Sequence, residues 1–208
     1  MKKWMKVLAV VLCLCFLQTP VMEGVTSVTE VQAAVKKGLK KEKGKYYYYV
    51  RGRKVKNTWK SVKIKNKKTH KKVTYRFYFG KNGAAYKGGS KWGESYLTIK
   101  TIKGKKYGFD KYSHMVKGDY VSKGKFWCFN SRTGKYDAKR TQKLRSASKE
   151  HSSAAALFAL IGSPLKRTAV DGCYGDGQEY QLDYANYRVG TFVSRATGQE
   201  TVIEVVSK

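Results

Sequence analysis

Gly44-Lys45-Tyr46-Tyr47-Tyr48-Tyr49 is the stretch that decides the fold, because versions of it return three more times along the 208-residue chain. The returns are Tyr75 to Phe79, Gly104 to Phe109 and Gly124 to Phe129. Their last aromatic residues are Tyr49, Phe79, Phe109 and Phe129, at spacings of 30, 30 and 20 residues. Self-similarity at such a period is typical of a repeat array in which each unit covers the next.

Each copy is followed by a turn signal, such as Asn82-Gly83, and then by a short return segment, such as Arg53-Lys54-Val55. Each unit is therefore predicted to be a β-hairpin that starts with the aromatic strand. A lone hairpin is marginally stable in water, so neighbouring units must cover the aromatic faces. Two insertions interrupt the period: residues 62–70, which lengthen the second hairpin, and residues 92–102, which alternate again between apolar and polar side chains.

The first residues are typical of an export signal. Met1 to Lys6 is basic, Val7 to Leu17 is nearly unbroken apolar sequence, and Val31-Gln32-Ala33 offers small residues for cleavage. The alternative is an uncleaved membrane anchor, but the apolar run is shorter than the ~20 residues of a spanning helix. We expect residues 1–33 to be a signal peptide, which places the protein outside the cell or on its surface. Only Cys128 and Cys173 then remain, and two free thiols are favoured over a bridge between them.

Positive charge is concentrated in the repeats. Residues 35–137 contain 31 Lys and Arg against 5 Asp and Glu, whereas residues 138–208 contain 10 against 7. This excess attracts polyanions, and the attraction weakens as salt is added. Nucleic acid is the less favoured partner, since the chain carries an export signal and the lysines are spread through every unit.

The sequence changes character near Thr141. A weak helical period covers residues 143–150, and Ser152 or Ser153 is expected to cap a more apolar helix, Ala154 to Ile161, that ends at Gly162. Three alternating segments follow, around residues 180–184, 187–192 and 201–206. The predicted fold class is mainly β: a β-hairpin repeat solenoid over residues 38–137 with four units, followed by a small α+β domain over residues 141–208, in which two helices pack on an antiparallel sheet.

Residues 38–137 resemble the cell-wall-binding, or choline-binding-type, repeats of Gram-positive surface proteins, whose pattern is close to Gly-Lys-x-Tyr-Tyr-Phe-x-x-x-Gly-x-Met-x-x-Gly-Trp. Gly44 to Tyr49 with Trp59, Phe77 to Phe79 with Asn82-Gly83, and Tyr107 to Phe109 with Met115 and Gly118 match best. The resemblance implies a hairpin solenoid, and in some members an aromatic cage for choline. The sequence departs from the pattern at Trp92, which is displaced relative to Gly88-Gly89, and at Asp119-Tyr120, where the pattern has Trp.

The segment Leu157 to Pro164, placed before a meander, resembles the small fold shared by β-lactamase inhibitor protein and outer-membrane assembly lipoproteins. That resemblance implies a C-terminal module that binds another protein and is not catalytic.

Alternation along an aromatic strand turns some rings inward as core and leaves others available to a ligand. The candidate ligand-binding residues are Tyr47, Tyr49, Trp59, Tyr78, Phe79, Trp92, Tyr107, Phe109, Tyr120 and Trp127, together with Lys45, Lys105 and Lys125. The expected ligand is a cell-wall polymer such as teichoic acid or another anionic polysaccharide, with choline kept as an alternative.

The spacing of the remaining chemistry-bearing residues does not indicate an enzyme. His70, His114 and His151 are far apart and are interpreted as solvated loop residues, so no metal site and no cofactor are predicted. No local signature supports Cys173 as a nucleophile, and the glycine-rich stretch from Asp171 to Gly177 breaks the pattern of a calcium loop. The function expected is therefore attachment to the cell wall through the repeats. The alternative is an inhibitor or adaptor that acts through the C-terminal domain, with the repeats as a basic stalk.

Overall fold

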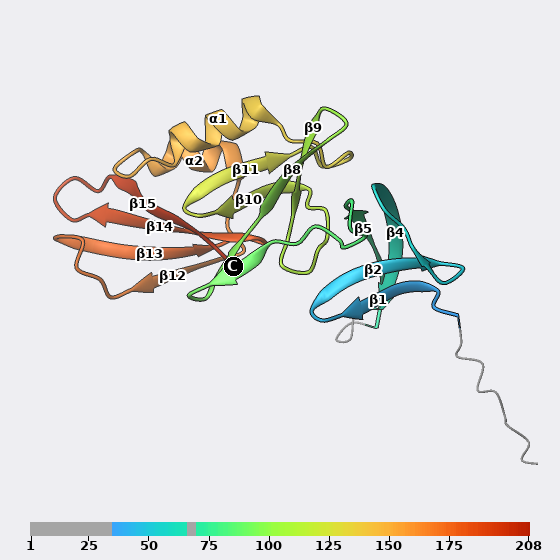
Figure 1. Cartoon of the computed structure of the whole chain (residues 1–208). Coiled ribbons are helices and arrows are strands. Elements are labelled where there is room, and N and C mark those ends of the chain that lie inside the picture. Colours follow the sequence, from blue (N-terminus) through green and yellow to red (C-terminus); the bar gives the residue numbers. More distant parts are fainter. Residues whose placement is uncertain (1–34, 66–69) are drawn as a thin grey trace, which may run out of the picture. The chain divides into compact units, whose positions relative to one another are not determined.

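The computed structural model describes residues 35–65 and 70–208, and the predicted signal peptide lies outside this part of the chain. Five antiparallel hairpins precede the helices in the described residues (Figure 1). They are β1 (Gly38–Glu42) with β2 (Lys45–Val50), β4 (Thr58–Lys65) with β5 (Lys72–Phe79), β6 (Gly89–Lys91) with β7 (Glu94–Tyr96), β8 (Thr98–Ile102) with β9 (Lys105–Phe109), and β10 (Gly118–Ser122) with β11 (Lys125–Phe129). The short strand β3 (Arg53–Lys54) adds to β2, as predicted for the first return segment.

The turn of each short hairpin is the dipeptide that ends in the glycine before the aromatic run. Lys103 and Gly104 have φ angles of 47° and 72°, and Lys123 and Gly124 have 54° and 66°. Positive φ at both central residues is the mark of a type I′ turn, which matches the twist of paired strands. The prediction that the aromatic strand comes first was therefore wrong. The aromatic strand is the second of its hairpin, because the Lys-Gly dipeptide before it forms the turn that connects the two strands.

The turn signals that follow the aromatic strands build the contacts between units. After β5, β9 and β11 the chain loops back, makes a β-bridge to the end of that strand, and donates one backbone N–H to the preceding unit. The three bonds are Ala85 N to Tyr46 O at 2.8 Å, Met115 N to Arg76 O at 2.7 Å and Tyr136 N to Lys106 O at 2.9 Å. Each acceptor lies three residues before the last aromatic residue of its strand, so the same docking is repeated at every interface.

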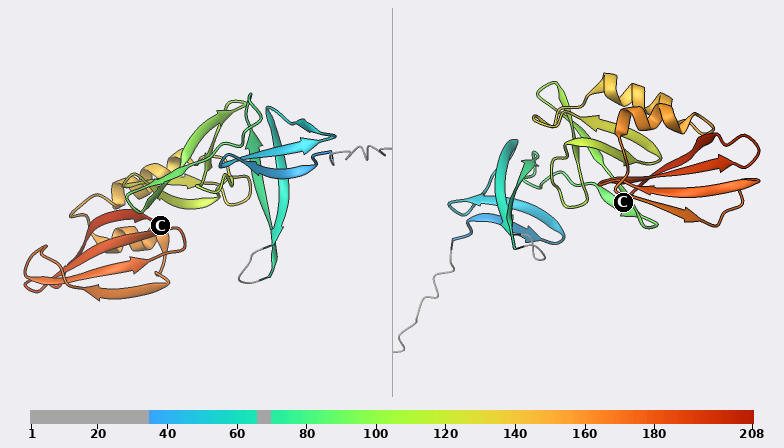
Figure 2. Two further views of the ribbon diagram at one scale, coloured as in Figure 1. Left: turned by 60° about the horizontal axis from the view of Figure 1, so that its bottom comes forward. Right: turned by 180° about the vertical axis from the view of Figure 1, so that it is seen from behind.

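Aromatic side chains fill the spaces between these units. Phe77 and Phe79 are fully buried against Tyr46 and Tyr48 of the first hairpin. The stacking of hairpins expected from the sequence is confirmed, and so is the mainly β repeat fold. Of the insertion at residues 62–70, residues 66–69 lie outside the described residues, and residues 62–65 extend β4, so that β4 and β5 have eight residues each (Figure 2). The insertion at residues 92–102 instead contributes half of the extra hairpin β6–β7 and the strand β8.

Two helices and a four-stranded antiparallel meander complete the chain. They are α1 (Ala138–Ala147), α2 (Ala154–Ile161), β12 (Lys166–Val170), β13 (Gly177–Asp183), β14 (Tyr187–Ser194) and β15 (Glu200–Ser207). Helix α2 has the predicted bounds. Helix α1 starts five residues earlier than predicted, because the Asp137 side chain accepts the backbone N–H of Arg140 and caps it. Strand β12 was missed, since its five residues, Lys166 to Val170, contain no large apolar side chain before the final valine and so show no clear apolar alternation.

The last hairpin and the C-terminal elements share one hydrophobic core. Val121, Phe126 and Cys128 of β10–β11 lie in the same buried cluster as Leu144 and Leu157 of the helices. The core also contains apolar side chains of the sheet: Leu182, Val189, Val202 and Val205. The boundary between the two predicted domains, at residues 137–141, is thus a change in secondary structure and composition, and the core continues across it.

Among the described residues, no helix is both long and apolar enough to cross a membrane.

Candidate functional site

An aromatic cluster lies between the long hairpin and the next repeat. The Trp59 ring meets Tyr78 and Tyr107 edge-on, each at 5.0 Å between centroids, and stacks on Phe109 at 6.0 Å. Trp59 and Tyr78 are opposite each other in the β4–β5 ladder, so both point to the same face of that hairpin. Sequence reasoning named all four residues, and the structure brings them together. Trp59, Tyr78 and Tyr107 are partly exposed, whereas Phe109 is buried, so the cluster offers aromatic surface that can attract a cation.

The cation at this cluster belongs to the chain itself. The Arg76 guanidinium lies 4.5 Å from the centroid of the Trp59 ring. Arg76 is two residues from Tyr78 on the same strand and therefore reaches the same face. A guanidinium over an indole face is attracted by the ring quadrupole, and a quaternary ammonium ligand would have to displace it. Sequence reasoning missed Arg76, although its position two residues before Tyr78 was a usable signal.

The chain's own cations cover other candidate rings in the same way. Lys54 Nζ lies 3.6 Å from the centroid of the Tyr47 ring, and the Arg145 guanidinium lies 4.7 Å from that of Trp127. Arg145 is further fixed because its Nε donates to the Phe126 carbonyl at 2.8 Å. These rings resemble cation sites that are already filled.

Three predicted ligand residues belong to the core. Tyr49 is 5% exposed, and its hydroxyl donates to the Glu42 carboxylate at 2.9 Å. Phe79 and Phe109 have no exposed surface, so a ligand in solution cannot reach them. Their assignment to a binding surface was wrong, because the repeat docks its neighbour against the face that holds them. Tyr120 is half-buried, and burial, with a contribution from the nearby Asp110 charge, raises its pKa to about 12.

The candidate lysines occupy one equivalent position. Lys45, Lys105 and Lys125 each follow the turn glycine and start an aromatic strand, and all three are exposed. In the part of the chain that the structure describes, none of them forms an ion pair. Their charges therefore remain available to a partner.

His114 lies beside a groove of about 460 Å³ that also includes Tyr75, Arg76, Lys117 and Tyr120. Its ring stacks on Tyr75 at 3.8 Å between centroids, and its Nδ1 lies 3.3 Å from Asp110 Oδ2. The interpretation of His114 as a solvated loop residue was wrong, since the loop that docks on β5 lays its imidazole on an aromatic ring. Within residues 35–65 and 70–208, no cluster of side chains suited to a metal ion is found.

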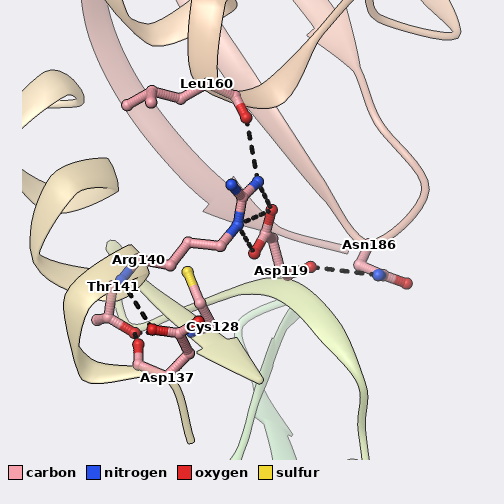
Figure 3. Close-up of polar contacts among 7 residues, drawn as sticks. All are labelled: Asp119, Cys128, Asp137, Arg140, Thr141, Leu160 and Asn186. Carbon is pink, nitrogen blue, oxygen red and sulfur yellow. Dashed lines mark hydrogen bonds and ion pairs between the residues drawn. The ribbon is translucent and has the colours of Figure 1, made fainter. Parts of the chain in front are cut away.

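A polar network joins the last hairpin to the helices and the sheet (Figure 3). Arg140 donates to both oxygens of the Asp119 carboxylate, at 2.6 Å from Nη2 and 2.9 Å from Nε, and to the Leu160 carbonyl at 3.0 Å. The Asn186 amide donates to the Asp119 carbonyl at 3.2 Å. Four elements or loops are thus held at one residue pair. Beside it, burial raises the pKa of the free Cys128 thiol to about 12, so this thiol is unreactive, whereas Cys173 is free and exposed.

Fold and site together define a basic protein of stacked β-hairpins that ends in a sheet with two helices. No protein-family model matches the chain, and no curated protein matches it.

Several solved structures are similar to the chain. Truncated alternansucrase from Leuconostoc mesenteroides has 17% identity and a TM-score of 0.33, over 76% of this chain and 11% of that one. Choline-binding protein F, in a complex with ipratropium, has 14% identity and a TM-score of 0.36, over 79% of this chain and 53% of that one. CbpJ from Streptococcus pneumoniae has 9% identity and a TM-score of 0.18, over 79% and 80%.

The chain thus spans about half of the choline-binding protein F chain and a small part of alternansucrase. At these TM-scores the fold assignment rests on the hairpins themselves.

Proposed function

We propose that this protein attaches to an anionic polymer of the bacterial cell wall through its basic hairpin repeats, without catalysing a reaction. The observation that carries this proposal is uncompensated charge on a regular scaffold. Residues 35–137 hold 31 Lys and Arg against 5 Asp and Glu. The equivalent lysines Lys45, Lys105 and Lys125 recur, exposed, at the start of the aromatic strands β2, β9 and β11.

The proposed ligand is the anion, and choline is the weaker alternative. Three candidate rings already have a cation over them: Arg76 over Trp59, Lys54 over Tyr47 and Arg145 over Trp127. A cationic ligand would have to displace these groups and would be repelled by the positive charge of the repeats. The lysines and arginines of every unit would attract a phosphate-rich or carboxylate-rich polymer. Teichoic acid and acidic wall polysaccharides share this chemistry.

The test is retention of the full secreted chain on purified Gram-positive cell walls, with and without prior removal of teichoic acid. Between about 0.1 M and 1 M salt the Debye length falls from about 10 Å to 3 Å, so retention should be lost over that range. Stripped walls should retain much less protein, and choline at constant ionic strength should not elute it. Retention that does not change with salt concentration, or elution by choline alone, would contradict the proposal.

The triple variant Lys45→Gln, Lys105→Gln, Lys125→Gln separates this function from its alternative. These side chains lie on the surface, so the fold is expected to survive, while retention should fall several-fold. The alternative is that the protein is an inhibitor or adaptor that binds another protein through its C-terminal module. The near balance of charge over residues 138–208 favours this alternative. In that case the triple variant would remain attached to the cell surface as well as the wild type does.

A further inference from the structure

The tip of the extra hairpin β6–β7 is occupied by an exposed tryptophan in a strained backbone conformation. Trp92 is 90% exposed and has a φ angle of 49°. The other non-glycine residues at the equivalent turn positions are Lys43, Lys103 and Lys123. A bulky aromatic residue in the left-handed region costs about 1–2 kcal/mol and gains no burial here. Trp92 differs from these three lysines in that a large apolar ring is left in solvent, which points to a function for the side chain outside the folded core.

A groove of about 520 Å³ lies beside this indole. Its other lining residues are Lys91, Glu94, Ser95, Tyr96 and Lys123. Lys123 comes from the turn of the last hairpin, so two hairpin turns meet around one groove. Lys91 Nζ lies 4.1 Å from the centroid of the Trp92 ring, and Lys123 Nζ lies 5.8 Å from that of Tyr96.

The floor of the groove is fixed by local packing. Tyr96 is opposite Gly89 in the β6–β7 ladder, and its ring lies where a Cβ on Gly89 would be, so only glycine allows this position. The next residue, Leu97, donates its backbone N–H to the Ser122 hydroxyl at 3.0 Å, which ties the base of this hairpin to β10. The groove is therefore held by the repeats, and Lys91, Trp92 and Glu94, which also line it, are exposed.

These groups match the chemistry of a sugar next to an anionic group. The apolar C–H face of a hexose stacks on the electron-rich face of an indole. The Glu94 carboxylate accepts hydrogen bonds from sugar hydroxyls, and the ammonium groups of Lys91 and Lys123 attract a neighbouring phosphate or carboxylate. We propose that the groove binds a hexose unit of a glycosylated polyanion. This inference rests on the proposed function, since it names which part of the wall polymer is recognised at one site.

The test compares two synthetic polymers of equal length and charge, polyglycerol phosphate with and without hexosyl substituents, by titration against the full secreted chain. The key variant is Trp92→Asn, because asparagine tolerates positive φ and preserves the turn while removing the ring. Tyr112→Ala is the matched control, since Tyr112 is also an exposed aromatic residue, at 57%, and does not line this groove. Thermal unfolding checks that both variants are folded.

The wild type and Tyr112→Ala should bind the glycosylated polymer about tenfold more tightly than the bare one, and Trp92→Asn should bind both equally. The indole emission should also shift on binding of the glycosylated polymer only. Equal binding of both polymers by the wild type, or an unchanged preference in Trp92→Asn, would overturn the inference and leave the proposed function standing. Failure of the wild type to bind either polymer would overturn both.

Discussion

At the scale of single residues, lysine and arginine side chains of the protein lie over the faces of its aromatic rings. The Arg76 guanidinium over Trp59 is the clearest case, because the ring also touches Tyr78 and Tyr107. Trp59 is one of the residues that make a repeat resemble a choline-binding unit, and Arg76, two positions before Tyr78 on β5, lies over its ring.

Replacing Arg76 should expose the face of the Trp59 ring that its guanidinium covers. We expect Arg76→Ala to bind choline at millimolar concentration, with a choline-dependent rise in Tm, whereas the wild type shows no rise. A cation–π contact of this kind contributes about 0.5–2 kcal/mol, so a weak site is expected. Arg132→Ala, at an exposed turn arginine, is the control. Choline binding by the wild type equal to that of Arg76→Ala would refute this prediction.

Glu42 gives the first hairpin its pH dependence. The hydrogen bond from Lys36, then that from the Tyr49 hydroxyl, lowers the pKa of this carboxyl from 4.5 to about 2. Because the folded-state pKa is depressed, the stabilisation is fully present above about pH 4.5 and is lost as the pH falls towards 2.

The protection factors of the β1–β2 amides, which compare their exchange rates with those of an unstructured peptide at the same pH, should therefore fall in the wild type as the pH is lowered from about 4.5 towards 2. Glu42→Gln should have lower protection factors at pH 7 and show no such fall, whereas Glu94→Gln should behave as the wild type does. If the Glu42→Gln profile follows that of the wild type, this carboxyl is not the titrating group.

At the scale of elements, the type I′ turns decide how each hairpin closes. A Cβ on Gly104 would meet no atom within 4 Å, but the φ angle of +72° is unfavourable for any other residue. Gly104→Ala should therefore destabilise the protein by about 1 kcal/mol through backbone strain alone. Urea unfolding measures this change, with Lys105→Ala as a control that leaves the turn glycine in place. A difference of less than a few tenths of a kcal/mol between the two variants would contradict the assignment of the turn.

At the scale of the whole molecule, the last hairpin is both a repeat and part of the C-terminal module. Its Val121, Phe126 and Cys128 are buried among the helices and the sheet, and its Asp119 pairs with Arg140 of α1. A fragment cut at residue 137 would expose this apolar surface, so the wall-binding experiments above keep the repeats and the C-terminal elements in one chain.

Arg140→Met tests this coupling. The pair is only partly shielded from solvent, with 42% and 16% of the two side chains exposed, so we expect a loss of about 1–2 kcal/mol in the free energy of unfolding. Lys139→Met, on the same helix and exposed, should change it by less than about 0.5 kcal/mol. The β10–β11 amides should lose exchange protection together with those of α1. Loss of protection in α1 alone would mean that the hairpin folds independently of the module.

Local sequence signals were enough to predict the elements that depend on interactions between residues close in sequence. The aromatic period from Tyr49 to Phe129 predicted hairpins that cover one another, and Gly162 predicted the end of α2. The lysines at 45, 105 and 125 are exposed because they start strands directly after turns. Strand order within each hairpin was predicted wrongly, since Lys-Gly before the aromatic run and Asn-Gly after it both read as turn signals.

The sequence by itself determined the repeat, its aromatic filling and its positive charge, because composition and period are properties of the chain. Only the tertiary structure decided which rings are core and which face solvent, since Phe79, Trp59 and Trp92 look alike until neighbouring units pack on them. It also decided that Arg76 covers Trp59, that His114 stacks on Tyr75, and that Trp92 meets Lys123 across a groove. These pairs lie 17, 39 and 31 residues apart. The β4–β5 ladder brings the first pair together and the packing of separate units brings the other two near each other, and no local sequence signal specifies which unit packs on which face.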